Sequence, residues 1–332
     1  MNNLSELYGK EFYEWALKNS SEKNIIKGEY LVKAGKEVEH IYFSEKINSE
    51  YQTFNKGKDL VILDGLEAYE LSGLDSFLTL SPPITDVVSI SECNYSQIPI
   101  EKFSKYIDSS NMIDTNFIIK YAQILSKKLQ SRNDLLANRE KETINELKKI
   151  LLFFGDLDEI DIAWFQKVGK HFKYKDKEII IEENKNVPFI YIILSGFTSV
   201  FITRGGKEIS VGQASKGEIL GEMSLLLTGK SQDVATASVE AIENADLIAI
   251  DKNLLRTKLN NDKGFSFRFY LSISRMLSFR LRDQLISSGL GIKNSNSTFN
   301  GFEIDYDDID LEMLSKFSSA GSKFDSFCRR FT

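Results

Sequence analysis

Cysteine and histidine are scarce in this chain, and their scarcity excludes two kinds of site. The 332 residues include two cysteines and two histidines. Cys93 and Cys328 cannot build a disulfide framework, so we expect a reducing, cytoplasmic location. His40 and His171 have no cysteine or carboxylate at ligand spacing, and we expect no metal site. The sequence also lacks a nucleophile–base pair, a P-loop and a dinucleotide fingerprint, so we expect no enzymatic activity.

Long apolar runs and a basic charge balance are absent as well. No stretch approaches the ~20 apolar residues of a membrane span, and the first residues lack the basic-then-apolar pattern of a signal peptide. Lysine and arginine number 42 against 48 aspartates and glutamates, which gives a net charge of −6. Because contacts to DNA phosphates need a basic surface, we expect no sequence-specific duplex binding.

The hydrophobic pattern predicts two β-rich blocks separated by helix. Residues 1–20 have helical spacing, and short strand-like runs with turn residues between them follow as far as about residue 100. Period 3.6 returns over 113–154, which predicts one long or once-broken helix that joins the blocks. A second β-rich block covers about 172–250, and a helix over 253–287 follows it.

The two β-rich blocks form an internal repeat. Residues 29–43, EYLVKAGKEVEHIYF, align without a gap to residues 178–192, EIIIEENKNVPFIYI. The chain therefore reads as helix, β-rich block, helix, and then the same order again. A length of 332 residues suits two domains of this kind.

Four segments of the second block resemble a known family. They are YIILSG at 191–196, GEILGEMSLLL at 217–227, ATASVEA at 235–241 and DLIAID at 246–251. Together they resemble the cyclic nucleotide-binding domain of catabolite-activator proteins and kinase regulatory subunits. The helix over 265–285 and the tail 317–331 resemble those of bacterial or cyanobacterial-type members that have two such domains and no DNA-binding domain.

The resemblance implies a fold class and a domain division. The class is α+β: two tandem jelly-roll-like β-barrels, of the cyclic nucleotide-binding type, are joined by a long helix and followed by a short helical tail. The division is 1–135 for a degenerate first domain, 136–160 for a helical linker, 161–288 for the second domain with its following helix, and 289–332 for a linker and tail.

The resemblance also implies a ligand cassette in the second block. In the family a Gly-Glu pair and a short helix are followed by a strand of small residues. A buried carboxylate can accept the ribose 2′-hydroxyl, and N–H groups at a helix start can bind a cyclic phosphate. The implied ligand-binding residues are Gly221, Glu222, Met223, Ser224, Ala235 and Thr236. The alternative is that Glu222 is only a carboxylate at a helix N-terminus.

The family's phosphate-binding arginine is missing from this cassette. It should stand at or next to Ala235, where the nearby residues are Gln232 and Asp233, and Lys230 is the only local cation. An aspartate there would repel a phosphate. In the first block, residues 73–88 are the counterpart and Leu74 replaces the glutamate. We therefore expect a cyclic nucleotide to bind the second domain weakly or not at all, and the first domain to have no ligand.

These observations leave three functions open. The leading hypothesis is a non-enzymatic regulatory or adaptor protein that acts through protein–protein contacts, with itself or within a large assembly. The alternatives are a sensor of cAMP, cGMP or another small nucleotide, and a structural component of a larger assembly. A DNA-binding regulator does not fit, because only 332 − 288 = 44 residues follow position 288 and they begin with a polar linker.

Two apolar surfaces are candidates for partner binding. A stripe at helical spacing and a tail rich in aromatic residues carry them. Their residues are Phe269, Ile273, Leu277 and Leu281 in the helix and Phe317 and Phe324 in the tail. The alternative is that the stripe is core and the tail folds back onto its own domain. The arginines of the same helix, from Arg268 to Arg282, read as a solvated face rather than a nucleic-acid surface.

Overall fold

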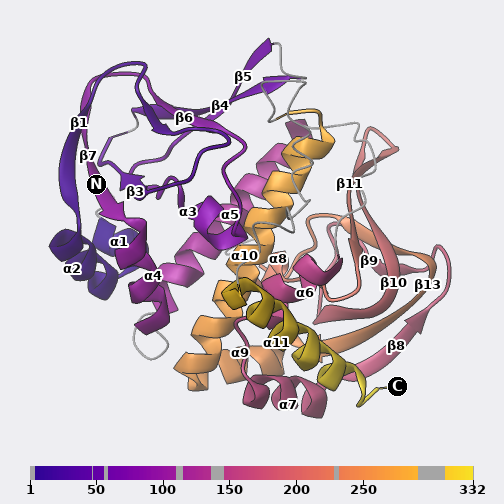
Figure 1. Cartoon of the computed structure of the whole chain (residues 1–332). Helices are drawn as coiled ribbons and strands as arrows, with labels where there is room; N and C mark the ends of the chain where they lie inside the picture. The colour runs from indigo at the N-terminus through magenta and orange to yellow at the C-terminus, as the bar shows by residue number, and fades with distance from the viewer. Residues whose placement is uncertain are drawn as a thin grey trace. The chain divides into compact units, whose positions relative to one another are not determined.

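A computed structural model of the full chain gives the fold. It describes residues 4–46, 48–55, 59–109, 115–135, 146–227, 232–290 and 311–331. The chain divides into two compact units (Figure 1). Unit 1 contains Met1–Tyr121 and Leu285–Gly301, and unit 2 contains Ala122–Gln284 and Phe302–Thr332. None of the described helices combines the length and the hydropathy that a membrane crossing needs.

Unit 1 consists of two small antiparallel sheets with helices before, between and after their strands. The three-stranded sheet has the order β1 (Ser21–Ile25), β7 (Cys93–Pro99), β3 (His40–Phe43). The four-stranded sheet has the order β2 (Tyr30–Val32), β6 (Asp86–Ser89), β4 (Ser49–Asn55), β5 (Asp59–Gly65). The helices are α1 (Leu4–Tyr8), α2 (Lys10–Asn19), α3 (Leu74–Thr79), α4 (Ile100–Ser109) and α5 (Thr115–Leu135), which continues into unit 2.

Aromatic side chains hold the helices of unit 1 together. Phe12 of α2 stacks on Phe117 of α5 with ring centroids 4.6 Å apart. Trp15 of α2 stacks on Tyr106 of α4 at 4.2 Å. Large rings bury much apolar area, and offset or edge-on pairs add to that gain. The abundance of phenylalanine and tyrosine in the sequence is used here to join α2, α4 and α5.

Unit 2 has one six-stranded antiparallel sheet. Its path is β11 (Lys207–Ser215), β10 (Phe189–Arg204), β13 (Ser238–Asp251), β8 (Lys170–Tyr174). β12 (Ile219–Leu220) pairs with β10, and β9 (Ile179–Ile181) pairs with β13. The helices are α6 (Glu146–Phe154), α7 (Glu159–Val168), the one-turn α8 (Met223–Leu226), α9 (Lys252–Asn261), α10 (Lys263–Ser287) and α11 (Leu311–Cys328).

The closed barrels expected from the sequence are not found in the described residues. Closure needs a ladder of hydrogen bonds between the two edge strands of a sheet. In unit 2 no such ladder joins β11 to β8, and in unit 1 the strands fall into two separate sheets. Register shifts interrupt the pairing of the long strands β10 and β13, which bends them without closing the sheet.

The predicted joining helix over 113–154 corresponds to α5 and α6, and residues 136–145 between them lie outside the described residues.

An aspartate capping box starts α7, because Asp158 accepts from the Asp161 amide and Asp161 accepts from the Asp158 amide.

Four elements of unit 1 recur in unit 2 at one spacing. α2, β1, β2 and β3 begin at residues 10, 21, 30 and 40. α7, β8, β9 and β10 begin at 159, 170, 179 and 189, which is 149 residues later in each case. The equal spacing therefore extends beyond the aligned stretch 29–43 to the strand and helix before it.

The stripe of α10 that was predicted to bind a partner lies in the core instead, which corrects that prediction. Phe269 has no exposed surface, and its ring meets Phe153 of α6 edge-on at 6.3 Å. Ile273, Leu277 and Leu281 are buried too. Side chains without exposed surface cannot anchor a partner, so the alternative interpretation, internal core, is the one that fits.

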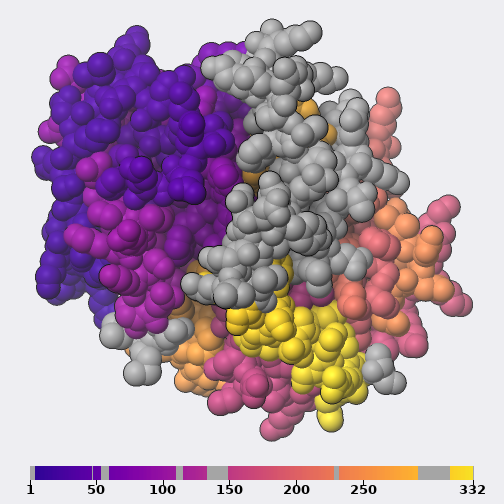
Figure 2. Space-filling view, viewed as in Figure 1, coloured from indigo at the N-terminus to yellow at the C-terminus, as the bar shows by residue number. Residues whose placement is uncertain are grey.

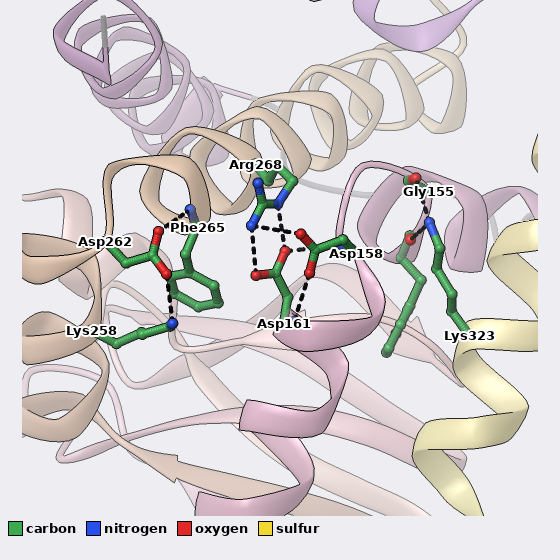
Figure 3. Close-up of polar contacts among 9 residues, drawn as sticks. Gly155, Asp158, Asp161, Lys258, Asp262, Phe265, Arg268 and Lys323 are labelled. Carbon is green, nitrogen blue, oxygen red and sulfur yellow. Dashed lines mark hydrogen bonds and ion pairs between the residues drawn. The ribbon is translucent and has the colours of Figure 1, made fainter. Parts of the chain in front are cut away.

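The C-terminal helix α11 folds back on its own unit, against α6 and α7. Phe324 is 1% exposed and its ring packs edge-on against Phe154 at 5.0 Å. Lys323 Nζ donates to the Gly155 carbonyl, 3.1 Å away, at the end of α6 (Figure 3). The exposed side of α11 is seen in yellow in Figure 2. The prediction of a partner surface at Phe324 is therefore corrected, whereas Phe317 is only half-buried.

The arginines of α10 also differ from the prediction, because they do not form a solvated face. Arg268 Nε donates to Asp161 Oδ2 at 2.6 Å, and Arg268 Nη2 lies 2.9 Å from Asp158 Oδ2 (Figure 3). Arg275 Nε donates to Asp156 Oδ2 at 2.7 Å. These ion pairs tie α10 to the start of α7, more than a hundred residues earlier in the chain.

Candidate functional site

The predicted cassette of unit 2 lies where β12 ends and α8 begins. Gly221 has φ +80°, a conformation that favours glycine. A Cβ on Gly221 would lie 3.0 Å from the Phe189 carbonyl oxygen and 3.2 Å from Val187 Cγ1. Glycine is therefore required both by the backbone angle and by the close approach of β10. It leads the chain directly into α8 with Glu222 at the start of the turn.

Glu222 is buried and paired with an arginine from α10. Its exposed fraction is 2%, and Arg280 Nη1 donates to Glu222 Oε1 at 2.5 Å. Arg280 Nη2 donates to the Ile219 carbonyl at 2.6 Å. Burial alone would lower the pKa of Arg280, but the carboxylates of Glu222 and Glu218 outweigh it and raise that pKa. The guanidinium therefore stays charged and holds the carboxylate that the sequence assigns to ribose.

A second buried acid, Glu218, extends this network to α6. Lys149 Nζ lies 2.5 Å from Glu218 Oε2 and donates to Ser215 Oγ at 3.0 Å. Glu218 Oε2 also accepts from the Ser215 amide at 2.8 Å. Arg280 Nε is 3.9 Å from Glu218 Oε1. Two buried acids and two bases thus alternate, and each charge has an opposite charge beside it.

A separate polar cluster joins α8 to α9. Ser224 Oγ donates to the Gly221 carbonyl at 2.6 Å and accepts a short hydrogen bond from Lys252 Nζ. Asp233 Oδ1 accepts from Arg256 Nη2 at 2.6 Å and from Lys252 Nζ at 3.4 Å. The Lys252 side chain is only 3% exposed. Burial lowers the pKa of Lys252 to about 8, although the Asp233 carboxylate opposes that change.

The structure brings the six predicted ligand-binding residues into one region. Thr236 Oγ1 lies 4.0 Å from Met223 Sδ, which places the strand segment beside α8. Ala235 is 5% exposed and its amide donates to the Lys185 carbonyl at 2.9 Å. An alanine side chain has no positive charge to offer a phosphate, so Ala235 does not replace the missing phosphate-binding arginine.

The local cations were missed by the sequence reasoning. Lys230, the one cation it named, lies outside the described residues. Lys252, Arg256 and Arg280 supply the positive charge instead. Their partners stand 19 to 58 residues away in the chain, so no local spacing could have revealed the pairs. Asp233, which the sequence analysis gives as a charge that would repel a phosphate, is contacted by two cations.

Unit 1 has the same turn without the carboxylate. A Cβ on Gly73, at φ +90°, would lie 2.9 Å from Val38 Cγ1 and 3.2 Å from the His40 carbonyl oxygen. Adding 149 to 38 and 40 gives Val187 and Phe189, the two residues that crowd Gly221. The residue after Gly73 is Leu74, which is 1% exposed. An apolar side chain thus occupies the position that Glu222 has in unit 2.

Residues 171–262 match the family model described as "Cyclic nucleotide-binding domain". Unit 2 contains a cyclic nucleotide-binding domain. The match covers β8 to α9 and includes the cassette. No curated protein matches the chain.

Solved structures with similarity to the chain include proteins of two kinds. The regulatory domain of Toxoplasma gondii PKA, crystallised with cAMP, is 15% identical with a TM-score of 0.31, over 82% of this chain and 90% of that one. The Thermus thermophilus catabolite activator protein is 23% identical with a TM-score of 0.34, over 40% of this chain and 59% of that one. At such values neither likeness bears on ligand or partner.

Proposed function

We propose that the chain is a non-enzymatic, cytoplasmic regulatory protein that acts through protein contacts, with a cassette in unit 2 that its own side chains keep closed. The observation that carries the proposal is the pair of Glu222 with Arg280. A ribose hydroxyl that displaced the guanidinium would leave a buried carboxylate without its cation. Leaving a buried charge unpaired costs about 3–5 kcal/mol, whereas a hydrogen bond to a charged group returns about 1.5–3 kcal/mol.

The position of Ala235 supports the same conclusion for the phosphate. A guanidinium matches two phosphate oxygens, and a methyl group offers them nothing. Each lost charge-assisted bond removes about 1.5–3 kcal/mol of binding free energy, which is about one to two powers of ten in affinity. Without an arginine to pair with the phosphate, cyclic nucleotides are therefore expected to bind unit 2 poorly.

We also propose that unit 1 is a degenerate copy of the same domain. The common spacing of 149 residues in four elements supports this, as do the matching neighbours of Gly73 and Gly221. With Leu74 in place of the carboxylate, unit 1 has lost the group that would accept a ribose hydroxyl. A domain that keeps its fold without its ligand is suited to a role in protein contacts, with a second copy or within a larger assembly.

Calorimetry with cAMP and cGMP on the full chain tests the proposal. We expect dissociation constants weaker than about 100 μM for both ligands, equivalent to less than about 5.5 kcal/mol of binding free energy. A constant in the low micromolar range that Glu222→Ala abolishes would overturn the proposal. Glu183→Ala is the control for loss of a paired carboxylate, because Glu183 pairs with Arg204 and not with Arg280.

A second function, a nucleotide sensor, is favoured by one observation. Arg280 belongs to α10, so a ribose that took Glu222 would release a contact of that helix. Hydrogen exchange with and without saturating cAMP separates the two functions. Faster exchange in α10 on addition of cAMP would support the sensor, and unchanged exchange supports the closed cassette.

A further inference from the structure

We propose that Asp233 is a built-in anion that takes the place of a ligand phosphate on Lys252 and Arg256, so that these two cations form an anion subsite that the chain itself occupies. The ligand class is a nucleotide with an anionic phosphate. The inference rests on the proposed closed state of the cassette and names the residue that keeps its charged part closed.

The cluster is continuous with the cassette. Lys252 Nζ donates to the Ser224 hydroxyl, and that hydroxyl donates to the carbonyl of Gly221. The same Nζ donates to Asp233 Oδ1, which also accepts from Arg256 Nη2. One carboxylate thus stands opposite two cations, beside the short helix whose start the family resemblance assigns to phosphate. An anion bound to these cations would adjoin Ser224.

Charge and access both suit an exchangeable anion. The Lys252 side chain is 3% exposed, and a buried ammonium needs an anion close by. Arg256 and Asp233 keep 30% and 25% of their side-chain surface exposed, so solvent reaches the outer side of the cluster. A single carboxylate leaves one positive charge over on the two cations. A cyclic phosphate has the same single charge and the same two terminal oxygens as a carboxylate, and it fits an arginine in a bidentate manner.

The backbone fixes Asp233 in this position. Its φ is +61°, in the left-handed region that asparagine and aspartate tolerate best among residues other than glycine. The Asp233 amide donates to the Ser224 carbonyl at 3.0 Å, and its carbonyl accepts from the Val187 amide at 2.8 Å. Asparagine can keep this conformation and both bonds. Asp233→Asn therefore removes the charge and leaves the turn in place.

The decisive experiment measures cAMP and adenosine binding to the full chain by calorimetry, for the wild type and for Asp233→Asn. We expect Asp233→Asn to bind cAMP at least about tenfold more tightly than the wild type. Adenosine, which has no phosphate, should show no gain. Adding Arg256→Met to Asp233→Asn should remove the gain. Circular dichroism checks that each variant is folded, and Asp233→Ala serves as a second variant.

Asp262→Asn is the matched control. Asp262 also pairs with a cation of α9, Lys258, and it accepts from the Phe265 amide (Figure 3). Asp262→Asn removes the same charge as Asp233→Asn, but Asp262 pairs with Lys258 and not with Lys252 or Arg256. A folded Asp233→Asn that binds cAMP no better than the wild type would overturn the inference, as would an equal gain with adenosine or with Asp262→Asn. Tight cAMP binding by the wild type would overturn the proposed function instead, and the inference would then stand only if Asp233→Asn still tightened it.

Discussion

Glu222 and Glu218 are carboxylates that the fold removes from water and pairs with basic side chains from two helices. Arg280 of α10 contacts both acids, and Lys149 of α6 contacts Glu218. Pairs of this kind contribute little net stability when compared with apolar residues, but breaking one leaves an uncompensated charge in the interior. Removing Arg280 is therefore expected to cost more stability than removing a cation from an exposed pair.

The first prediction concerns Arg280→Met. The substitution leaves Glu222, 2% exposed, without its cation. We expect the free energy of unfolding to fall by about 3–5 kcal/mol, measured by urea denaturation. Lys10→Met is the control, because the Lys10–Glu14 pair is 84% and 64% exposed and such pairs contribute at most about 1 kcal/mol. Equal effects of the two substitutions would contradict the role of burial.

The second prediction concerns pH and Lys252. Burial lowers the pKa of Lys252 in the folded chain to about 8, below the value of 10.5 for an unperturbed lysine. Between these values the folded state binds fewer protons than the unfolded state. Stability contributed by this residue therefore rises with pH, by up to about 1.4 kcal/mol per pH unit. Wild type minus Lys252→Met, measured by denaturation from pH 7 to pH 10, should show this slope. A flat difference would contradict it.

At the residue scale, the sequence predicted where the cassette residues lie in the fold better than it predicted which side chains they pair with. Gly221 and Glu222 were placed correctly at a turn before a short helix because the motif is contiguous. The ion pairs of Glu222 and Asp233 were not predicted, because opposite charges attract through space and leave no periodic signal along the chain. For the same reason the arginines of α10 were taken for a solvated face. Only packing decides which of several cations meets a buried acid.

At the scale of elements, α11 shows how an amphipathic helix can be mistaken for an interface. Its aromatic residues have the spacing of a binding surface, and the sequence alone could not tell which surface they meet. The contacts answer this for Phe324 and Phe327, which pack on Phe154 at 5.0 and 5.7 Å. The helical tail expected from the sequence is found as one helix over Leu311–Cys328.

The third prediction tests whether α11 is core. Phe324→Ala removes a ring that is 1% exposed, and it should lower the free energy of unfolding by about 3–5 kcal/mol. Phe317→Ala, on the same helix at a half-buried position, should cost clearly less. Urea denaturation of both variants makes the comparison. If Phe324→Ala unfolds like the wild type, α11 does not belong to the core of unit 2.

At the scale of the whole molecule, the equal spacing of elements in the two units could be predicted, and the closure of the sheets could not. Identical residues at matching positions in 29–43 and 178–192 predicted this spacing. β2 and β9, like β3 and β10, then begin at equivalent residues. Barrel closure depends on register shifts in long strands such as β10, and a sequence of alternating residues does not specify where a strand bends.

The fourth prediction compares the glycine before α3 in unit 1 with the glycine before α8 in unit 2. Gly73 and Gly221 share a positive φ and equivalent neighbours. An alanine at either position meets backbone strain of about 1–2 kcal/mol and, in addition, a clash with β3 or β10 that costs about 1–3 kcal/mol. We therefore expect Gly73→Ala and Gly221→Ala to lower stability by similar amounts, each in its own unit.

Two other glycines separate the clash from the strain. Gly28 in unit 1 and Gly205 in unit 2 also have positive φ, but a Cβ at either would meet nothing within 4 Å. Gly28→Ala and Gly205→Ala should therefore cost only the backbone term. Hydrogen exchange assigns each loss to a unit: Gly73→Ala should expose amides of β2 and β3, and Gly221→Ala those of β9 and β10. If Gly73→Ala behaves like Gly28→Ala while Gly221→Ala does not, the two turns are not equivalent, which contradicts the proposal that unit 1 is a degenerate copy of the domain in unit 2.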